Sequence, residues 1–170
     1  FINIADSLEQ DDSEIFTLKG MIAQARMQVD PMNRWMKYGA ESTSNFNKAM
    51  SLDTLNPRPE YLMGVGLFYT PEQFGGGPKT AKPLLEKSLE KFNQSLAIEK
   101  KFNSQLGLAI NYQNIGYALE QKGELEMALS NYKASLQYNN EINSKLGKVI
   151  CHNSIGQIYL KQNKPIEALK

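Results

Sequence analysis

The residues best suited to chemistry are few, and they do not converge on a reaction. His152 is the only histidine in the 170-residue chain and follows the only cysteine, Cys151. Neighbouring residues on a helix point to different faces, whereas a catalytic or metal site needs several groups directed at one point. We therefore expect Cys151 to be a small core residue and His152 to be a packed or half-buried helix residue. The sequence supports no catalytic residue and no metal ligand.

The segment from Gly75 to Thr80 contains the residue types of a phosphate-binding loop. Such a loop reads Gly-x4-Gly-Lys-Ser/Thr and follows a buried strand. Here Pro78 stands directly before Lys79, and the preceding segment has a helical pattern. A flexible turn explains these glycines better, so we predict no nucleotide and no other cofactor.

The remaining polar candidates are carboxylate pairs and an aromatic–basic cluster. Asp11 with Asp12, and Glu124 with Glu126, lie in expected turns or helix ends, where carboxylates are most simply solvated. The cluster from Arg34 to Tyr38 could bind a ligand, but such residues more often cover the end of a neighbouring helix. These patterns make an enzyme the least favoured class of protein.

The charge balance favours a protein partner over nucleic acid or a membrane. The chain has 19 Lys and Arg against 18 Asp and Glu, a formal net charge of +1. Binding to nucleic acid or to an anionic membrane usually requires a basic excess. No apolar run approaches the roughly 20 residues of a membrane helix, and the first residues lack the pattern of a signal peptide. We expect a soluble protein of the cytoplasm or the periplasm.

A 40-residue repeat organises the C-terminal half of the chain. Gly116 aligns with Gly156, and Ile115 aligns with Ile155. The other aligned segments are Ala128-Leu129 with Ala168-Leu169, Ser95-Leu96 with Ser135-Leu136, and Asn103 to Gly107 with Asn143 to Gly147. Small, apolar and turn residues of this kind are what stacked helical hairpins need.

Each repeat contains two helices separated by a short turn. Apolar residues at three- and four-residue spacing predict a helix over 105–121 and a second helix that begins near Leu125. Gly123 can adopt the left-handed conformation that ends a helix. We expect Gly116 and Ala128 to lie where the two helices cross, because only small side chains allow a close approach there.

These residues resemble the tetratricopeptide repeat (TPR). The family pattern is matched, in order, by Tyr112, Ile115, Gly116, Leu119, Gly123, Ala128, Tyr132 and Ser135, and in the next copy by His152, Ile155, Gly156, Tyr159, Asn163 and Ala168. The period of 40 exceeds the usual 34, and this longer form is similar to the repeats of bacterial sensor and peptide-receptor proteins. The resemblance implies an all-α fold in which antiparallel helical hairpins stack as a short right-handed solenoid.

The N-terminal half is of the same kind but less regular. Asp12 to Glu14 predicts the start of a helix that Pro31 closes, and a second helix runs to about Leu52. Further helices are expected from Glu60 to Tyr69 and from near Lys79. This half resembles TPR proteins of Bacteroidetes-type bacteria, and the resemblance rests on the segments Asn56 to Arg58, Leu67 to Pro71 and Phe74 to Gly77.

The two halves follow registers that differ by seven residues. In the second helix of a hairpin, the TPR pattern has an alanine or other small residue, then a large residue, then another small residue. Counted forward from the glycine-rich loop, these positions fall on Ala81, Leu85 and Ser88. Counted back by 40 residues from the C-terminal repeat, they fall on Ser88, Phe92 and Ser95. Seven residues keep the same helix face within about 20°. One helix can therefore serve both registers.

This register change predicts the domain organisation. We expect N-terminal TPR-like repeats over 1–93 and C-terminal 40-residue repeats over 94–170, joined through a continuous helix over about 79–100. A fusion of two subfamilies, which would make the chain an engineered or de novo chimera, explains the seam. A natural insertion explains it equally well.

The TPR resemblance implies a ligand groove on the concave face, lined by the first helix of each hairpin. The groove residues expected here are Asn111, Asn114, Tyr117, Gln121, Asn153 and Gln157. Amide side chains offer both a donor and an acceptor to the backbone of an extended peptide. The alternative is that these residues are simply solvated. A chaperone-type carboxylate clamp is incomplete, because Ile150 and Ser154 occupy two of its positions.

The favoured function is therefore a non-catalytic module that binds a protein or an extended peptide. The alternative is a structural or engineered helical-repeat scaffold that associates with itself. The short last helix would leave Ile158, Tyr159, Ile166 and Leu169 without a capping neighbour, and this end would then pair with a second copy as a homodimer. At the other end, Phe1, Ile2 and Ile4 suggest part of a helix from a longer repeat.

Overall fold

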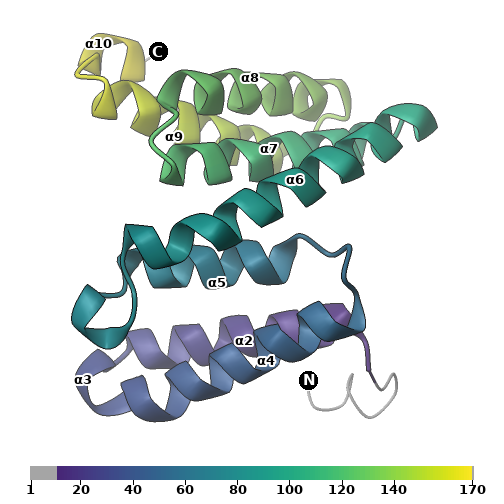
Figure 1. The fold of residues 1–170 in the computed structure, drawn as a ribbon. Helices are drawn as coiled ribbons and strands as arrows, with labels where there is room; N and C mark the ends of the chain where they lie inside the picture. The colour runs from purple at the N-terminus through teal and green to yellow at the C-terminus, as the bar shows by residue number, and fades with distance from the viewer. Residues whose placement is uncertain (1–10, 170) are drawn as a thin grey trace. The chain divides into compact units, whose positions relative to one another are not determined.

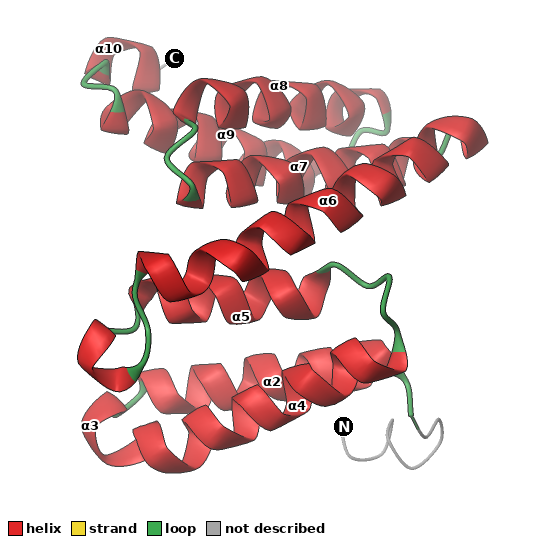
Figure 2. Ribbon diagram, viewed as in Figure 1, coloured by secondary structure: helices red, strands yellow, loops and turns green. Residues whose placement is uncertain are grey.

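The computed structural model describes residues 11–169, and this range contains helices and no strands (Figures 1 and 2). The prediction of an all-α fold built from antiparallel helical hairpins is confirmed for these residues. The expectation for Phe1, Ile2 and Ile4 lies outside them. None of the described helices combines the length and the hydrophobicity needed to cross a membrane. The chain divides into two compact units, Phe1–Ser88 and Leu89–Lys170, which we call unit 1 and unit 2.

Unit 1 contains two helical hairpins. Its elements are α2 (Ser13–Gln28), α3 (Pro31–Arg34), the π-helix η1 (Trp35–Gly39), α4 (Ala40–Leu52), α5 (Arg58–Tyr69), the 3-10 turn η2 (Glu72–Phe74) and the first part of α6 (Pro78–Phe102). The carboxylate of Asp12 caps α2 by accepting hydrogen bonds from the backbone N–H groups of Glu14 and Ile15, at 2.6 and 3.1 Å. This is the predicted helix start, and Pro31 opens α3 where the first helix was expected to have ended.

Both hairpins of unit 1 pack a glycine of the first helix against a large residue of the second. A Cβ atom on Gly20 would lie 2.5 Å from Cε1 of Phe46, so α2 and α4 approach closely. A Cβ atom on Gly64 of α5 would lie 3.0 Å from Cδ2 of Leu85 on α6. Phe46 and Leu85 are each 1% exposed. These glycine contacts therefore fix where the helices of each hairpin cross.

Unit 2 is the more regular of the two. Its helices are the remainder of α6, α7 (Gln105–Gln121), α8 (Leu125–Glu141), α9 (Lys145–Lys161) and α10 (Pro165–Ala168). Left-handed residues follow successive helices at 20-residue intervals: Asn103, Gly123, Asn143 and Asn163, with φ between 52° and 82°. Asn and Gly are the residues that adopt this conformation most readily. The predicted 105–121 helix and the turn at Gly123 are therefore both present.

The hairpin of α7 and α8 repeats the glycine packing of unit 1. A Cβ atom on Gly116 would lie 2.5 Å from Cε1 of Tyr132, and Tyr132 and Ala128 are both 0% exposed. In the next copy, a Cβ atom on Gly156 would meet only the carbonyl oxygen of Ala168, at 3.5 Å. The two aligned glycines therefore stand in different surroundings.

Helix α6 is continuous from Pro78 to Phe102 and contributes to both cores. Within unit 1, Ala81, Leu85 and Ser88 are buried; within unit 2, Phe92 and Leu96 are buried. The boundary between the units falls after Ser88, five residues before the predicted boundary at 93/94. The origin of this seam, by fusion or by insertion, stays a prediction.

One expected core residue is exposed. His152 aligns with Tyr112, which lies half-buried with its ring stacked on Tyr138 of α8 at 5.7 Å between centroids. His152 itself is exposed, so the prediction of a packed or half-buried residue is wrong. Among the described residues, no aromatic ring stacks on His152 as Tyr138 stacks on Tyr112.

Candidate functional site

Three of the predicted groove residues share one face of α7. Asn114, Tyr117 and Gln121 follow each other at three- and four-residue spacing, which places them on one side of a helix. All three are half-buried, and Ile110, 52% exposed, extends the same face by one turn. No hydrogen bond joins the amide of Asn114 or Gln121 to another described residue. These two amides are therefore open to a ligand.

Asn111, also on α7, packs against α6. Its side chain is buried, and its Nδ2 donates a hydrogen bond to Oγ of Ser95 on α6 at 3.0 Å. In α7 it stands three positions before Asn114, but it serves the packing of α7 on α6 within unit 2. The Asn111 amide is therefore occupied in the contact between α7 and α6, unlike the amides of the half-buried Asn114 and Gln121.

The contact between α7 and α9 orients Tyr117. Nε2 of Gln113 donates to Oγ of Ser154 at 3.2 Å, and that hydroxyl in turn donates to Oη of Tyr117 at 3.4 Å. The ring of Tyr117 also meets Tyr132 edge-on, with centroids 5.4 Å apart. A Tyr side chain held at both its ring and its hydroxyl loses little freedom when a ligand binds.

The two predicted groove residues on α9 are exposed. Asn153 aligns with Gln113 and Gln157 aligns with Tyr117, the two α7 residues that contact Ser154 of α9. In the preceding repeat, α9 thus covers the positions on α7 that are equivalent to Asn153 and Gln157. Neither side chain hydrogen-bonds to another residue in the described part of the chain.

Cys151 is the buried residue that the sequence predicts. It is 1% exposed, its thiol donates to Oε1 of Gln113 at 3.1 Å, and Nδ2 of Asn139 donates to its sulfur at 3.6 Å. Desolvation by burial raises the pKa of the thiol above its ordinary value of 9.0, against the opposing effect of the hydrogen bonds with Ser135 and Asn139.

We expect Cys151 to resist alkylation in the folded protein. The thiolate is the reactive form, and burial disfavours it, so iodoacetamide at pH 8 should modify Cys151 about 100-fold more slowly than in urea. Because the unfolded chain loses this proton first, the free energy of unfolding should also fall as pH rises above 9.0.

A cysteine at an exposed position provides the control. Val149 lies on the same helix and is 67% exposed, so Val149→Cys in a Cys151→Ala background should react at the rate of the unfolded chain. Equal rates at the two positions, measured by mass spectrometry, would contradict the protected setting of Cys151.

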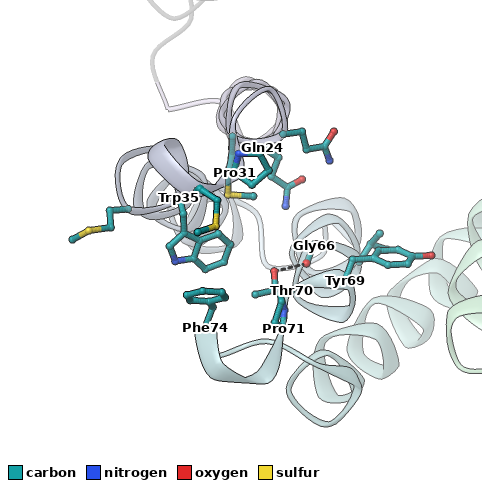
Figure 3. Close-up of a pocket in the computed structure, with 13 residues that line it drawn as sticks. Gln24, Pro31, Trp35, Gly66, Tyr69, Thr70, Pro71 and Phe74 are labelled. Carbon is teal, nitrogen blue, oxygen red and sulfur yellow. Dashed lines mark hydrogen bonds between the residues drawn. The ribbon is translucent and has the colours of Figure 1, made fainter.

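Unit 1 holds a pocket that the sequence did not reveal as a site. It has a volume of about 620 Å³. Its lining is largely apolar and consists of Gln24, Met27, Gln28, Pro31, Met32, Trp35, Met36, Val65, Gly66, Tyr69, Thr70, Pro71 and Phe74. Figure 3 shows the rings of Trp35 and Phe74 next to each other, and their centroids are 5.8 Å apart with the ring planes tilted by 46°. Pockets of about 300–1,000 Å³ are typical of small-molecule sites.

The glycine-rich loop places Phe74 at this pocket. Gly75 and Gly77 have φ values of 81° and 95°, a conformation that residues with a Cβ rarely adopt. The backbone N–H of Gly77 donates to the carbonyl of Leu67 at 2.8 Å and so folds the loop back on α5. A Cβ atom on Gly76 would lie 2.3 Å from the carbonyl oxygen of Thr70. The turn that the sequence predicts here therefore holds Phe74 at the pocket.

The other wall of the pocket begins at an irregular helical turn. Trp35–Gly39 forms a π-helix between α3 and α4, and such insertions occur frequently at functional sites. The aromatic–basic cluster from Arg34 to Tyr38 was the sequence signal for this wall. Its ligand-binding interpretation was the less favoured one, because such residues more often cover the end of a neighbouring helix.

Comparisons with known proteins give distant structural likenesses only. No protein-family model matches the chain, and no curated protein matches its sequence. Among solved structures, the MamA RS-1 ArsTM double mutant is 16% identical, with a TM-score of 0.47 over 99% of this chain and 75% of that chain. A crystal structure of MamA is 17% identical, with a TM-score of 0.46 over 99% and 78%. MamA 41-end from Desulfovibrio magneticus RS-1 is 16% identical, with a TM-score of 0.32 over 89% of each chain.

Proposed function

We propose that the chain is a non-catalytic protein-binding module that holds an extended peptide segment along the exposed face of α7. The observation that supports this most is the pair of amides on Asn114 and Gln121, which have no partner among the described residues. The orientation of Tyr117 between them adds a fixed aromatic contact. The TPR resemblance, in which the first helix of each hairpin lines the groove, favours the same face.

The spacing of the two amides suits an extended peptide. Seven residues separate Asn114 from Gln121, which is a rise of about 10 Å along a helix. Three residues of an extended chain cover about the same distance. Each amide can donate to one backbone carbonyl and accept from one N–H, so the face would bind backbone with little demand on sequence. Asn153 and Gln157 on α9 would extend this contact.

The test is a selection of binding peptides followed by substitution of the face. Peptides would be selected from a random displayed library on the whole chain, and their affinities measured by calorimetry. The double variant Asn114→Ala with Gln121→Ala should weaken these peptides by about tenfold, because each lost amide leaves peptide groups without a partner.

The matched control removes two amides from the second helix of the same hairpin. Gln137 and Asn140 are exposed on α8, and the double variant Gln137→Ala with Asn140→Ala should bind the selected peptides as the wild type does. If the two double variants lost affinity equally, or if neither did, the α7 face would not be the binding surface.

Self-association is the second candidate, favoured by exposed apolar side chains of the last repeat. Leu146, Val149, Leu160, Ile166 and Leu169 are between 57% and 89% exposed. Of the residues expected from the sequence to lack a covering neighbour, Ile158 is instead fully buried, because it packs into the core of unit 2. Light scattering on a sizing column separates the two functions. A monomer of 19.2 kDa at the concentrations of the peptide titration supports the peptide site, whereas a stable dimer that excludes peptide supports the scaffold.

A further inference from the structure

We propose that the pocket of unit 1 binds a neutral, largely apolar small molecule that carries a hydrogen-bond donor. The pocket lies between α2, the turn of α3 and η1, α5 and η2, and all its lining residues belong to unit 1. The proposal therefore stands independently of the peptide face on α7.

The volume and lining of the pocket fit a small molecule. A cavity of about 620 Å³ lies in the middle of the range in which drug-sized ligands are enclosed. Trp35 and Phe74 provide flat aromatic surface. Met32 and Met36, each 86% exposed, provide flexible thioether side chains at the pocket. Methionine adapts to irregular apolar shapes, so these two residues can close over a ligand.

The absence of charged residues in the lining favours a neutral ligand. The lining residues include no Asp, Glu, Lys, Arg or His. An ionised group that entered the pocket would lose hydration without gaining an opposite charge, which is strongly unfavourable. A neutral apolar ligand gains from burial against the same residues.

Two polar side chains of the pocket, Gln24 and Thr70, offer an acceptor to a bound molecule. Nε2 of Gln24 donates to the carbonyl of Leu62 at 3.4 Å, which leaves Oε1 of that amide as an acceptor. The hydroxyl of Thr70 donates to the carbonyl of Gly66 at 2.9 Å, which leaves its oxygen lone pairs as acceptors (Figure 3). These two acceptors can each take an O–H or N–H group of a bound small molecule.

The test compares two dyes that share an aromatic framework. N-phenyl-1-naphthylamine is neutral and has one N–H, and 8-anilinonaphthalene-1-sulfonate adds a negative charge. One molecule of the neutral amine should bind per chain, and it should bind at least about tenfold more tightly than the sulfonate.

Trp35 is the only tryptophan of the chain and lines the pocket, so energy transfer from Trp35 to the bound dye reports occupancy of this site. The ether 1-phenoxynaphthalene, which lacks the N–H, should bind about fivefold more weakly than the amine, as measured by its displacement of the amine.

Two matched substitutions locate the bound dye. Val65→Phe adds a ring at a half-buried position of the pocket wall and should abolish energy transfer, whereas Val149→Phe, the same change at an exposed position of unit 2, should leave it unchanged. Circular dichroism confirms that both variants are folded. Equal affinity for the two dyes, retained binding in folded Val65→Phe, or displacement of the amine by apolar peptides but not by neutral small molecules would overturn the proposal.

Discussion

Gly116→Ala should lower the free energy of unfolding by about 1–3 kcal/mol, whereas Gly156→Ala should raise it by up to about 1 kcal/mol. The two glycines are aligned in the repeat, and each stands inside a helix. At Gly116 the new methyl group would lie 2.5 Å from the ring of Tyr132. At Gly156 the nearest atom stands 3.5 Å away, so only the higher helix propensity of alanine remains.

Tyr132 cannot move aside to accommodate the methyl group. Its side chain is 0% exposed, and its hydroxyl donates to Oε2 of Glu120 at 2.5 Å. Urea unfolding of both variants, followed by the helical circular dichroism signal, measures the difference. Equal effects at Gly116 and Gly156, in either direction, would show that the close crossing of α7 and α8 does not constrain this position.

Lys161→Met should lower the free energy of unfolding by about 1–3 kcal/mol. Nζ of Lys161 on α9 donates to Oε1 of Glu120 on α7 at 2.6 Å. The Glu120 side chain is 5% exposed and the Lys161 side chain is 48% exposed. Removal of the ammonium leaves a buried carboxylate without its counter-charge. The solvent exposure of Lys161 moderates the loss below that of a fully buried pair.

A second substitution tests the cause of that loss. Glu120→Gln removes the buried charge and keeps an acceptor for the hydroxyl of Tyr132. In the Glu120→Gln background, Lys161→Met should therefore cost much less than in the wild type, and a double-mutant cycle from urea unfolding gives the interaction energy. Additive effects would mean that the ion pair does not join α7 to α9.

Local sequence patterns predicted the helices well because each boundary has its own chemical signal. Asp12 caps α2, and α7 spans the predicted residues 105–121. Gly123 ends α7 in the left-handed conformation, with φ of 82°. Turn and cap residues act on their immediate neighbours, so one sequence suffices to place them. The antiparallel hairpins then follow from short connections.

Whether a polar helical residue is buried or open to solvent was harder to predict. Asn111 and Asn114 have the same side chain and stand less than one turn apart, yet Asn111 is buried against Ser95 and Asn114 is half-buried. Their difference depends on where α6 packs on α7. A single buried asparagine leaves the same mark in the sequence as a solvated one, because its hydrogen-bond partner comes from another helix.

The pocket of unit 1 could not be predicted from the sequence for a related reason. Trp35 and Phe74 stand 39 residues apart, and their contact depends on an irregular turn at Trp35–Gly39 and on the fold of the glycine-rich loop. Neither feature has a periodic signal. The aromatic–basic cluster and the loop were each visible as motifs, but only the tertiary fold brings them together.

The most direct test of the central claim, that the exposed face of α7 binds an extended peptide, is an NMR titration of the ¹⁵N-labelled chain with a selected peptide. The side-chain amide signals of Asn114 and Gln121 should shift with a single saturating affinity. The amide signal of Asn111, whose Nδ2 is bound to Ser95, should stay in place. Saturated binding that leaves Asn114 and Gln121 unmoved while the amides of Gln137 and Asn140 on α8 shift would contradict the claim.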